Sequence, residues 1–235
     1  MKLSFWNVAL HYDRVVALRD VTLNLEPGRI VAVIGVNGAG KSSFLRVASG
    51  VVFPDKGSVT YDGTPLRRDD LALRRRMFFL PDVPALFPKE TLIRNLSVIL
   101  RLFEADGVDV GKLASQTLAE LSILELARDH VGTFSRGQIY KTALAALRVV
   151  NPELWLLDEP FSAGMDFIGT AAFRRYARDA AKGGATVVYS AQMLETVEGF
   201  ADEVVMLNHG RIFAHEPIAN LGKIVSQIGA QEFVG

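Results

Sequence analysis

The sequence contains no cysteine, which excludes disulfide bonds and thiolate metal sites and leaves the redox compartment open. It also lacks a charge imbalance, because 26 Lys and Arg residues stand against 26 Asp and Glu residues. Net charge therefore gives no reason to expect binding to nucleic acid or to an anionic membrane surface. The first residues contain no apolar segment of the kind found in secretory signals.

Long apolar runs are missing as well, since none approaches the ~20 residues that a membrane-spanning helix needs. The longest candidate, 92–103, is interrupted by Arg94, Asn95 and Arg101. We therefore expect a soluble chain of the cytosolic type, whose role at a membrane would come through a partner. A length of 235 residues favours one large domain, or one domain with an inserted lobe.

One glycine-rich stretch, 35–42, reads Gly-Val-Asn-Gly-Ala-Gly-Lys-Ser. It follows a predicted buried strand, 30–34, and precedes a stretch with helical spacing, 43–48, as a phosphate-binding loop does. Glycines let backbone N–H groups turn toward phosphate oxygens, Lys41 supplies charge to the β- and γ-phosphates, and Ser42 offers a ligand to Mg²⁺. These flanking elements disfavour an ordinary glycine-rich turn. The expected contacts to ATP are Gly35, Asn37, Gly38, Ala39, Gly40, Lys41, Ser42 and Ser43.

Further apolar patterns predict the rest of an α/β chain. Two alternating runs, 3–10 and 21–25, predict a small antiparallel sheet around the turn that carries Tyr12. Residues 85–150 read as mainly helical, with Ser135 as a helix N-cap and Gln138 at the capping-box spacing. The other predicted elements are strands at 58–61, 77–80, 154–157, 186–190 and 203–207, helices at 167–182 and 194–201, and a hairpin at 208–213.

Two adjacent acids, Asp158 and Glu159, end the predicted strand 154–157. Ligands of open α/β sheets bind at the carboxyl ends of strands, and successive side chains of a strand point in different directions. Asp158 is thus suited to hold Mg²⁺, and Glu159 to polarise a water in line with the γ-phosphate. The competing interpretation is a solvated acidic strand end, which the nearby phosphate loop disfavours.

Together these motifs resemble the ATP-binding subunits of ABC transporters over nearly the whole chain, 3–213. The resemblance rests on the order of the phosphate loop, the segment 134–138 (Phe-Ser-Arg-Gly-Gln, similar to the family signature Leu-Ser-Gly-Gly-Gln) and the acidic strand end. It implies the ABC ATPase fold, which has a P-loop NTPase core with a mainly parallel sheet, an N-terminal antiparallel β-subdomain and an inserted helical lobe. We expect a single domain with a core at 1–82 and 151–213, a lobe at 83–150 and a short tail at 214–235.

The resemblance further implies a head-to-tail dimer that holds two ATP molecules at its interface. Ser135, Gly137 and Gln138 of one subunit would contact the ATP on the phosphate loop of the other. The positive end of the helix that begins there suits an anion. Tyr12 matches the aromatic residue that stacks on adenine, and Asp166 matches the aspartate of the D-loop.

Three positions depart from the family pattern. Asp82 stands where the family usually has a glutamine, and we expect it to serve the reaction by binding Mg²⁺ or by accepting a hydrogen bond from a water. Gln192 replaces the usual histidine; its amide can donate to the γ-phosphate but cannot shuttle a proton. Arg136 replaces a glycine and either adds a cation near the γ-phosphate or points to solvent. ATP hydrolysis is expected, with Glu159 as the base, at a slow rate.

The function that the resemblance implies is ATP hydrolysis that energises a membrane transporter, which we expect to be an exporter. The chain would lie on the cytoplasmic face of the cell membrane, with a membrane-spanning subunit docked on 83–96 and a second ATPase subunit, identical or related. Two alternatives stay open: a non-transport ABC ATPase, or a regulatory nucleotide-binding module with slow hydrolysis. Small-molecule kinases and GTPases are disfavoured, because they do not account for the segment 134–138 or for Tyr12.

Overall fold

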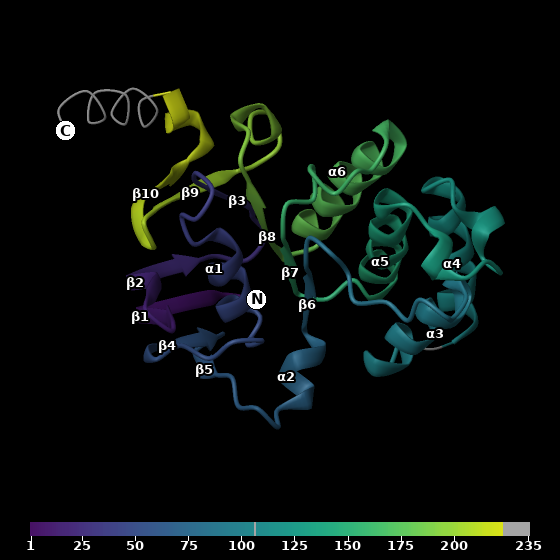
Figure 1. Ribbon diagram of the computed structural model, residues 1–235, viewed down its shortest axis with the longest axis horizontal. Coiled ribbons are helices and arrows are strands. Elements are labelled where there is room, and N and C mark those ends of the chain that lie inside the picture. Colours follow the sequence, from purple (N-terminus) through teal and green to yellow (C-terminus); the bar gives the residue numbers. More distant parts are fainter. Residues whose placement is uncertain (106, 223–235) are drawn as a thin grey trace.

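Two β-sheets and a group of helices make up the chain in a computed structural model, which describes residues 1–105 and 107–222 (Figure 1). The larger sheet has the strand order β10-β9-β3-β8-β7-β6. Its strands are β3 (Ile30–Ile34), β6 (Met77–Leu80), β7 (Leu154–Leu157), β8 (Thr186–Ala191), β9 (Glu203–Asn208) and β10 (Arg211–Pro217). Neighbouring strands pair in parallel, except that β10 pairs antiparallel with β9.

The central strands of this sheet are apolar because both faces of the sheet are covered. Every residue of β3, β7 and β8 is buried. Along β3, Ile30 and Ala32 belong to one hydrophobic core, and Val31 and Val33 belong to the core on the opposite face. Burial on both faces explains why these strands read as continuous apolar runs.

The smaller sheet is antiparallel, with the order β2-β1-β4-β5. Its strands are β1 (Leu3–Tyr12), β2 (Val15–Leu25), β4 (Lys56–Tyr61) and β5 (Thr64–Pro65), and α1 (Lys41–Ala48) packs against it through stacked rings of Phe5 and Phe44. The predicted antiparallel sheet is confirmed, but β2 begins at Val15 rather than at residue 21. Cross-strand pairing of Tyr12 with Val15 extends the hairpin into residues that lack an alternating pattern.

Three longer helices lie between β6 and β7 in the chain and form a group on the side away from the antiparallel sheet (Figure 1). They are α3 (Leu92–Leu102), α4 (Val108–Glu120) and α5 (Arg136–Val150), with the 3₁₀ turns η1 (Leu124–Leu126) and η2 (Val131–Thr133) between α4 and α5. The apolar spacing of Leu92, Leu96 and Leu100 is confirmed, because all three are buried. The domain boundaries that the sequence suggests stay a prediction.

The remaining helices are α2 (Leu71–Arg75), α6 (Phe167–Lys182), η3 (Leu194–Thr196) and η4 (Ile218–Asn220). The predicted helix 194–201 was wrong in length, because only η3 forms and turns follow it. Of the predicted tail, residues 223–235 lie outside the described ranges. Within those ranges, no helix has both the length and the apolar character required to cross a membrane.

The order of the parallel strands brings the predicted functional residues to one edge of the sheet. β3, β8, β7 and β6 are successive parallel neighbours, so their carboxyl ends lie side by side. The phosphate loop follows β3, Gln192 follows β8, the acidic pair follows β7, and Asp82 follows β6. This edge is the position where open α/β sheets bind ligands.

Candidate nucleotide site

The phosphate loop joins β3 to α1 and packs against the antiparallel sheet. Gly40, the N-cap of α1, has a φ of +106°, and a Cβ built there would lie 2.6 Å from the carbonyl oxygen of Ala17 on β2. Only glycine meets both conditions. Lys41 curls back over the loop, and its Nζ donates to the carbonyl oxygens of Gly35 at 2.8 Å and Val36 at 3.4 Å. The buried Lys41 ammonium therefore lies against the backbone of the phosphate loop.

The Glu159 carboxylate lies between two predicted site residues. Its Oε1 is 3.5 Å from Lys41 Nζ and accepts a hydrogen bond from Gln192 Nε2 at 3.0 Å. The side chain of Glu159 is only 13% exposed, and its φ of +49° is uncommon for a residue other than glycine. The structure thus brings Lys41, Glu159 and Gln192 together, and the amide of Gln192 donates to the glutamate.

Asp158 is oriented by a residue that sequence reasoning missed. Ser190, at the end of β8, is fully buried; its Oγ donates to Asp158 Oδ1 at 2.7 Å and accepts from the backbone N–H of Glu159 at 2.8 Å. One hydroxyl therefore fixes both acids of the pair. The available signal was a polar residue that ends an otherwise apolar core strand, on the strand adjacent to the acidic pair.

Asp82 forms an ion pair with Arg136, the first residue of α5. Both side chains are about half exposed. The Arg136 guanidinium thus has a carboxylate partner within its own chain, which neither expectation for Arg136 included.

The N-terminus of α5 is built as the sequence predicts. Ser135 is the N-cap, and the capping box with Gln138 is complete: the backbone N–H of Ser135 donates to Gln138 Oε1 at 2.8 Å, and Ser135 Oγ accepts from Gln138 N at 3.2 Å. Gly137 is buried, and a Cβ there would lie 2.2 Å from the carbonyl oxygen of Gly164. The helix therefore begins close to the loop 163–166, and its positive end is fixed in place.

A second missed residue is Tyr140, one turn further along α5. It is fully buried, and its hydroxyl is the only buried side-chain polar atom in the described ranges that has no hydrogen-bond partner there. Burial raises the pKa of the Tyr140 hydroxyl well above its ordinary value, and the charges of Asp158, Asp82 and Glu159 raise it further. The hydroxyl thus lies within electrostatic reach of all three acids.

Two other predicted residues lie outside the cluster of acids. Tyr12 ends β1 and is 38% exposed, on the same antiparallel sheet that contacts the phosphate loop. Asp166 is the N-cap of α6, where its Oδ1 accepts from Gly169 N at 2.8 Å and its Oδ2 accepts from the buried Lys141 Nζ at 2.7 Å. The hydrogen bond from Lys141, followed by that from Gly169, lowers the pKa of Asp166.

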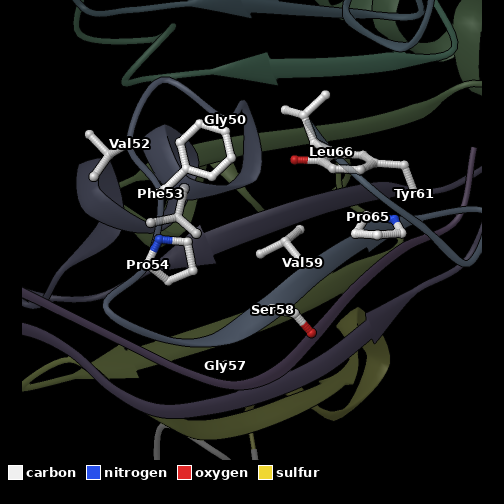
Figure 2. Close-up of a pocket in the computed structure, with 11 residues that line it drawn as sticks. Gly50, Val52, Phe53, Pro54, Gly57, Ser58, Val59, Tyr61, Pro65 and Leu66 are labelled. Carbon is white, nitrogen blue, oxygen red and sulfur yellow. The ribbon is translucent and has the colours of Figure 1, made fainter. Parts of the chain in front are cut away.

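An apolar pocket of about 180 Å³ lies elsewhere, between the end of α1 and β4 (Figure 2). No charged side chain lines it, and the hydroxyl of Tyr61 donates to the carbonyl oxygen of Ala48 at 2.7 Å. A triphosphate is therefore not the ligand of this pocket. Its lining residues are Val47, Gly50, Val52, Phe53, Pro54, Gly57, Ser58, Val59, Tyr61, Pro65 and Leu66.

A parallel sheet with a phosphate loop on its first core strand and an acidic pair on a neighbouring strand defines a phosphate-loop nucleotide-binding protein. Comparison with known proteins makes the class specific. Residues 18–162 match the family model described as "ABC transporter". The chain belongs to this family; it is an ATP-binding subunit that hydrolyses ATP for transport.

Individual relatives agree with this assignment. The chain is 30% identical to the ABC-type transporter ATP-binding protein EcsA of Bacillus subtilis over 210 residues, which cover 89% of this chain and 85% of EcsA. It is 30% identical over 219 residues to the sulfate/thiosulfate import ATP-binding protein CysA of Caulobacter vibrioides, covering 90% of this chain and 63% of CysA. A solved ATP-binding subunit of an ABC transporter superposes with a TM-score of 0.89 at 25% identity, covering 96% and 94% of the two chains.

Proposed function

We propose that two such subunits close around ATP, each triphosphate bound by the phosphate loop of one subunit and by the segment 134–138 of the other. The supporting observation is that the predicted site residues form two sets of contacts, which the ion pair of Asp82 with Arg136 connects within one chain. Glu159 contacts both Lys41 and Gln192 at the edge of the sheet, whereas Ser135 and Gln138 form the capping box of α5. The helix α5 belongs to the group that lies away from the antiparallel sheet (Figure 1). A second subunit, identical or related, brings the second set to the first.

In this site each residue of the core has a distinct role. Lys41 exchanges its backbone partners for the β- and γ-phosphates, and the backbone N–H groups of 37–43 complete the cradle. Glu159 accepts the proton of the attacking water and is held for this role by Lys41 and Gln192. The capped N-terminus of α5 presents Ser135 and the Gly137 amide to the γ-phosphate across the interface.

The donor set near the loop fits Mg²⁺, which prefers one or two protein oxygens together with phosphates and water. Ser42 begins α1 directly after Lys41, and the carboxylate of Asp158 is already oriented by Ser190. Ser42 and Asp158 would hold the ion, which neutralises charge that develops on the phosphates. Asp82 fits this role poorly, because its carboxylate is paired with Arg136.

Replacement of Glu159 tests its assignment as the general base. Glu159→Gln should lower the ATPase kcat by about 10²- to 10⁴-fold, because it removes the proton acceptor and keeps the shape. ATP binding, measured with a fluorescent analogue, should persist. The matched control is Glu125→Gln, an exposed glutamate in η1, which should leave the rate unchanged. An unchanged rate in Glu159→Gln would overturn the assignment of the base.

Turnover should be slow because Gln192 offers an amide where a proton carrier is usual. Gln192→His should leave kcat equal or raise it. A sharp fall in kcat would instead show that the hydrogen bond from Gln192 Nε2 to Glu159 has a role of its own.

The partner that we propose is a membrane-spanning subunit, which would place this chain on the cytoplasmic face of the membrane. Its contact would be the segment 83–96, where Val83 is 67% and Phe87 is 57% exposed. The buried Asn95 holds the loop, because its amide group bonds both the N–H and the carbonyl oxygen of Phe87. A rigid loop that displays apolar side chains suits protein docking.

Phe87→Glu should uncouple ATP hydrolysis from transport in a complex with the membrane subunit, while hydrolysis continues. Intact coupling would reject this contact. The direction that we propose is export, on the basis of the segment 80–88 (Leu-Pro-Asp-Val-Pro-Ala-Leu-Phe-Pro). Substrate flux in vesicles decides the direction, since a relative named for import has the same 30% identity to this chain as EcsA.

A further inference from the structure

The contact between Asp82 and Arg136 joins two parts of the site that lie 54 residues apart in the sequence. Asp82 follows β6, whose last residue, Leu80, accepts a backbone hydrogen bond from the Asp158 N–H at 2.8 Å. Arg136 is the first residue of α5 and lies next to the capping serine, Ser135. The ion pair therefore connects the strand edge that carries the acids to the helix N-terminus that carries the signature serine.

Both ends of this connection are firmly held. The capping box fixes the first turn of α5, and Gly137 touches Gly164 too closely for any side chain. On the other end, the backbone bond to Leu80 fixes the start of the loop to β7.

Electrostatic repulsion is a second reason for the pairing of Asp82 with Arg136. Asp82 follows β6 and the pair Asp158 and Glu159 follows the neighbouring strand β7, so three carboxylates stand at one edge of the sheet. Like charges repel, and a triphosphate adds more negative charge. Lys41 lies near Glu159, and Arg136 neutralises Asp82. Asp82 stands where the family usually has a glutamine, and Arg136 stands where it usually has a glycine. The two replacements contact each other.

We propose that Asp82 and Arg136 act as one positioning pair, which sets the signature turn relative to the acidic strand end, and that Asp82 is not a magnesium ligand. This inference rests on the proposed ATPase function. Neither residue is catalytic: each acts by holding the other. Because an exposed ion pair contributes little to stability, the pair should affect kcat more than folding.

A double-mutant cycle tests the pair in the complete chain, or in its complex with the membrane subunit. Asp82→Asn, Arg136→Gln and the double variant are compared for kcat, KM for ATP and the magnesium concentration that gives half-maximal rate. Each single variant should lower kcat by about threefold to tenfold, and the double variant should be no worse than either. KM and the magnesium requirement should stay within twofold of the wild type. The charge exchange Asp82→Arg with Arg136→Asp should recover kcat relative to either single reversal.

The matched control is Arg175→Gln, which removes one side of an ion pair of similar exposure between α6 and α4. It should leave all three parameters unchanged, and thermal melting of every variant checks folding.

Three results would overturn the pairing: factors on kcat that multiply in the double variant, single variants with wild-type kcat, or an increased magnesium requirement in Asp82→Asn alone. The last result would make Asp82 a metal ligand. A wild-type chain that neither binds nor hydrolyses ATP would instead refute the proposed function itself, and that measurement is made first.

Discussion

Two neighbouring strand ends carry acids that are held in opposite ways. Asp158, at the end of β7, is buried, and its partner Ser190 is a neutral residue of the adjacent core strand. Asp82, after β6, is half exposed, and its partner Arg136 is a charged residue of a helix in another part of the chain. One acid is thus fixed to the core, and the other to the helical group.

The difference indicates what each acid can do. A buried carboxylate with a neutral donor keeps its negative charge for a cation, so Asp158 suits Mg²⁺. The negative charge of Asp82 is already balanced by the guanidinium of Arg136, so Asp82 is suited to hold the strand end and the start of α5 in position. Substitutions around the buried acid, at Lys41 or Ser190 (the core side), should therefore change ATP binding or stability strongly. Substitution of Asp82 should change stability only slightly.

Among the changes in binding and stability, the largest is expected at Lys41, on the core side. Lys41→Met should weaken ATP binding by about 10- to 100-fold, because hydrogen bonds to charged groups contribute about 1.5–3 kcal/mol each. Binding is measured by titration with a fluorescent nucleotide. Lys182→Met, at the exposed end of α6, is the control and should bind normally. Equal affinities for the two variants would refute the phosphate-binding role of the loop.

The next effect sharpens the contrast between the two acids. Ser190→Ala leaves a buried carboxylate and a buried N–H without their partner, which should cost about 1–3 kcal/mol of unfolding free energy and also lower kcat. Asp82→Asn should cost no more than about 1 kcal/mol. Urea denaturation measures both, with Ser115→Ala on the surface of α4 as the control. A smaller loss for Ser190→Ala than for Asp82→Asn would reverse the comparison.

The pH dependence of stability tests a third acid, Asp166, which is the N-cap of α6. The hydrogen bond from Lys141 lowers the pKa of Asp166, so its contribution to stability is complete above the ordinary Asp pKa of about 3.9 and is lost as the pH falls through the lowered value. Asp166→Asn retains the helix cap but loses the ion pair. We expect a deficit of about 1 kcal/mol at pH 7, since the carboxylate is 56% exposed.

The deficit of Asp166→Asn relative to the wild type should shrink below about pH 3.9, which urea titrations at several pH values reveal. A deficit that is independent of pH would show that the cap, and not the charge, is what the substitution disturbs.

The smallest effect has the opposite sign. Tyr140→Phe removes a buried hydroxyl that has no partner among the described residues, so stability should stay equal or rise by up to about 1 kcal/mol. Thermal melting measures this change. A clear loss of stability would mean that the hydroxyl is satisfied in the native protein and that its position near the acids has another purpose.

Local patterns predicted most of the fold because each strand and cap depends on neighbouring residues. The buried run 154–157, the capping box at Ser135 and the bounds of α6 all follow from spacing of apolar and capping side chains. The start of β2 at Val15 was missed, because pairing with Tyr12 across the hairpin outweighs the weak local pattern.

The site was predictable where a motif is contiguous and was not where contacts join distant segments. The phosphate-loop motif identifies Lys41, and the acidic strand end identifies Asp158 and Glu159. The contacts of Ser190 with Asp158 and of Arg136 with Asp82 depend on how strands and helices pack. A polar residue at the end of an apolar strand marks Ser190, but the sequence does not name its partner, nor that of Arg136.

The central claim, ATP held between two subunits, is tested most directly by sedimentation of Glu159→Gln with ATP and Mg²⁺. The account predicts a species of twice the 25.7 kDa mass, or a pair with a related chain, that disappears when ATP is replaced by ADP or when Ser135→Glu is added. A species that stays monomeric while ATP is bound, alone and with the membrane subunit or any related ATPase chain, would contradict it.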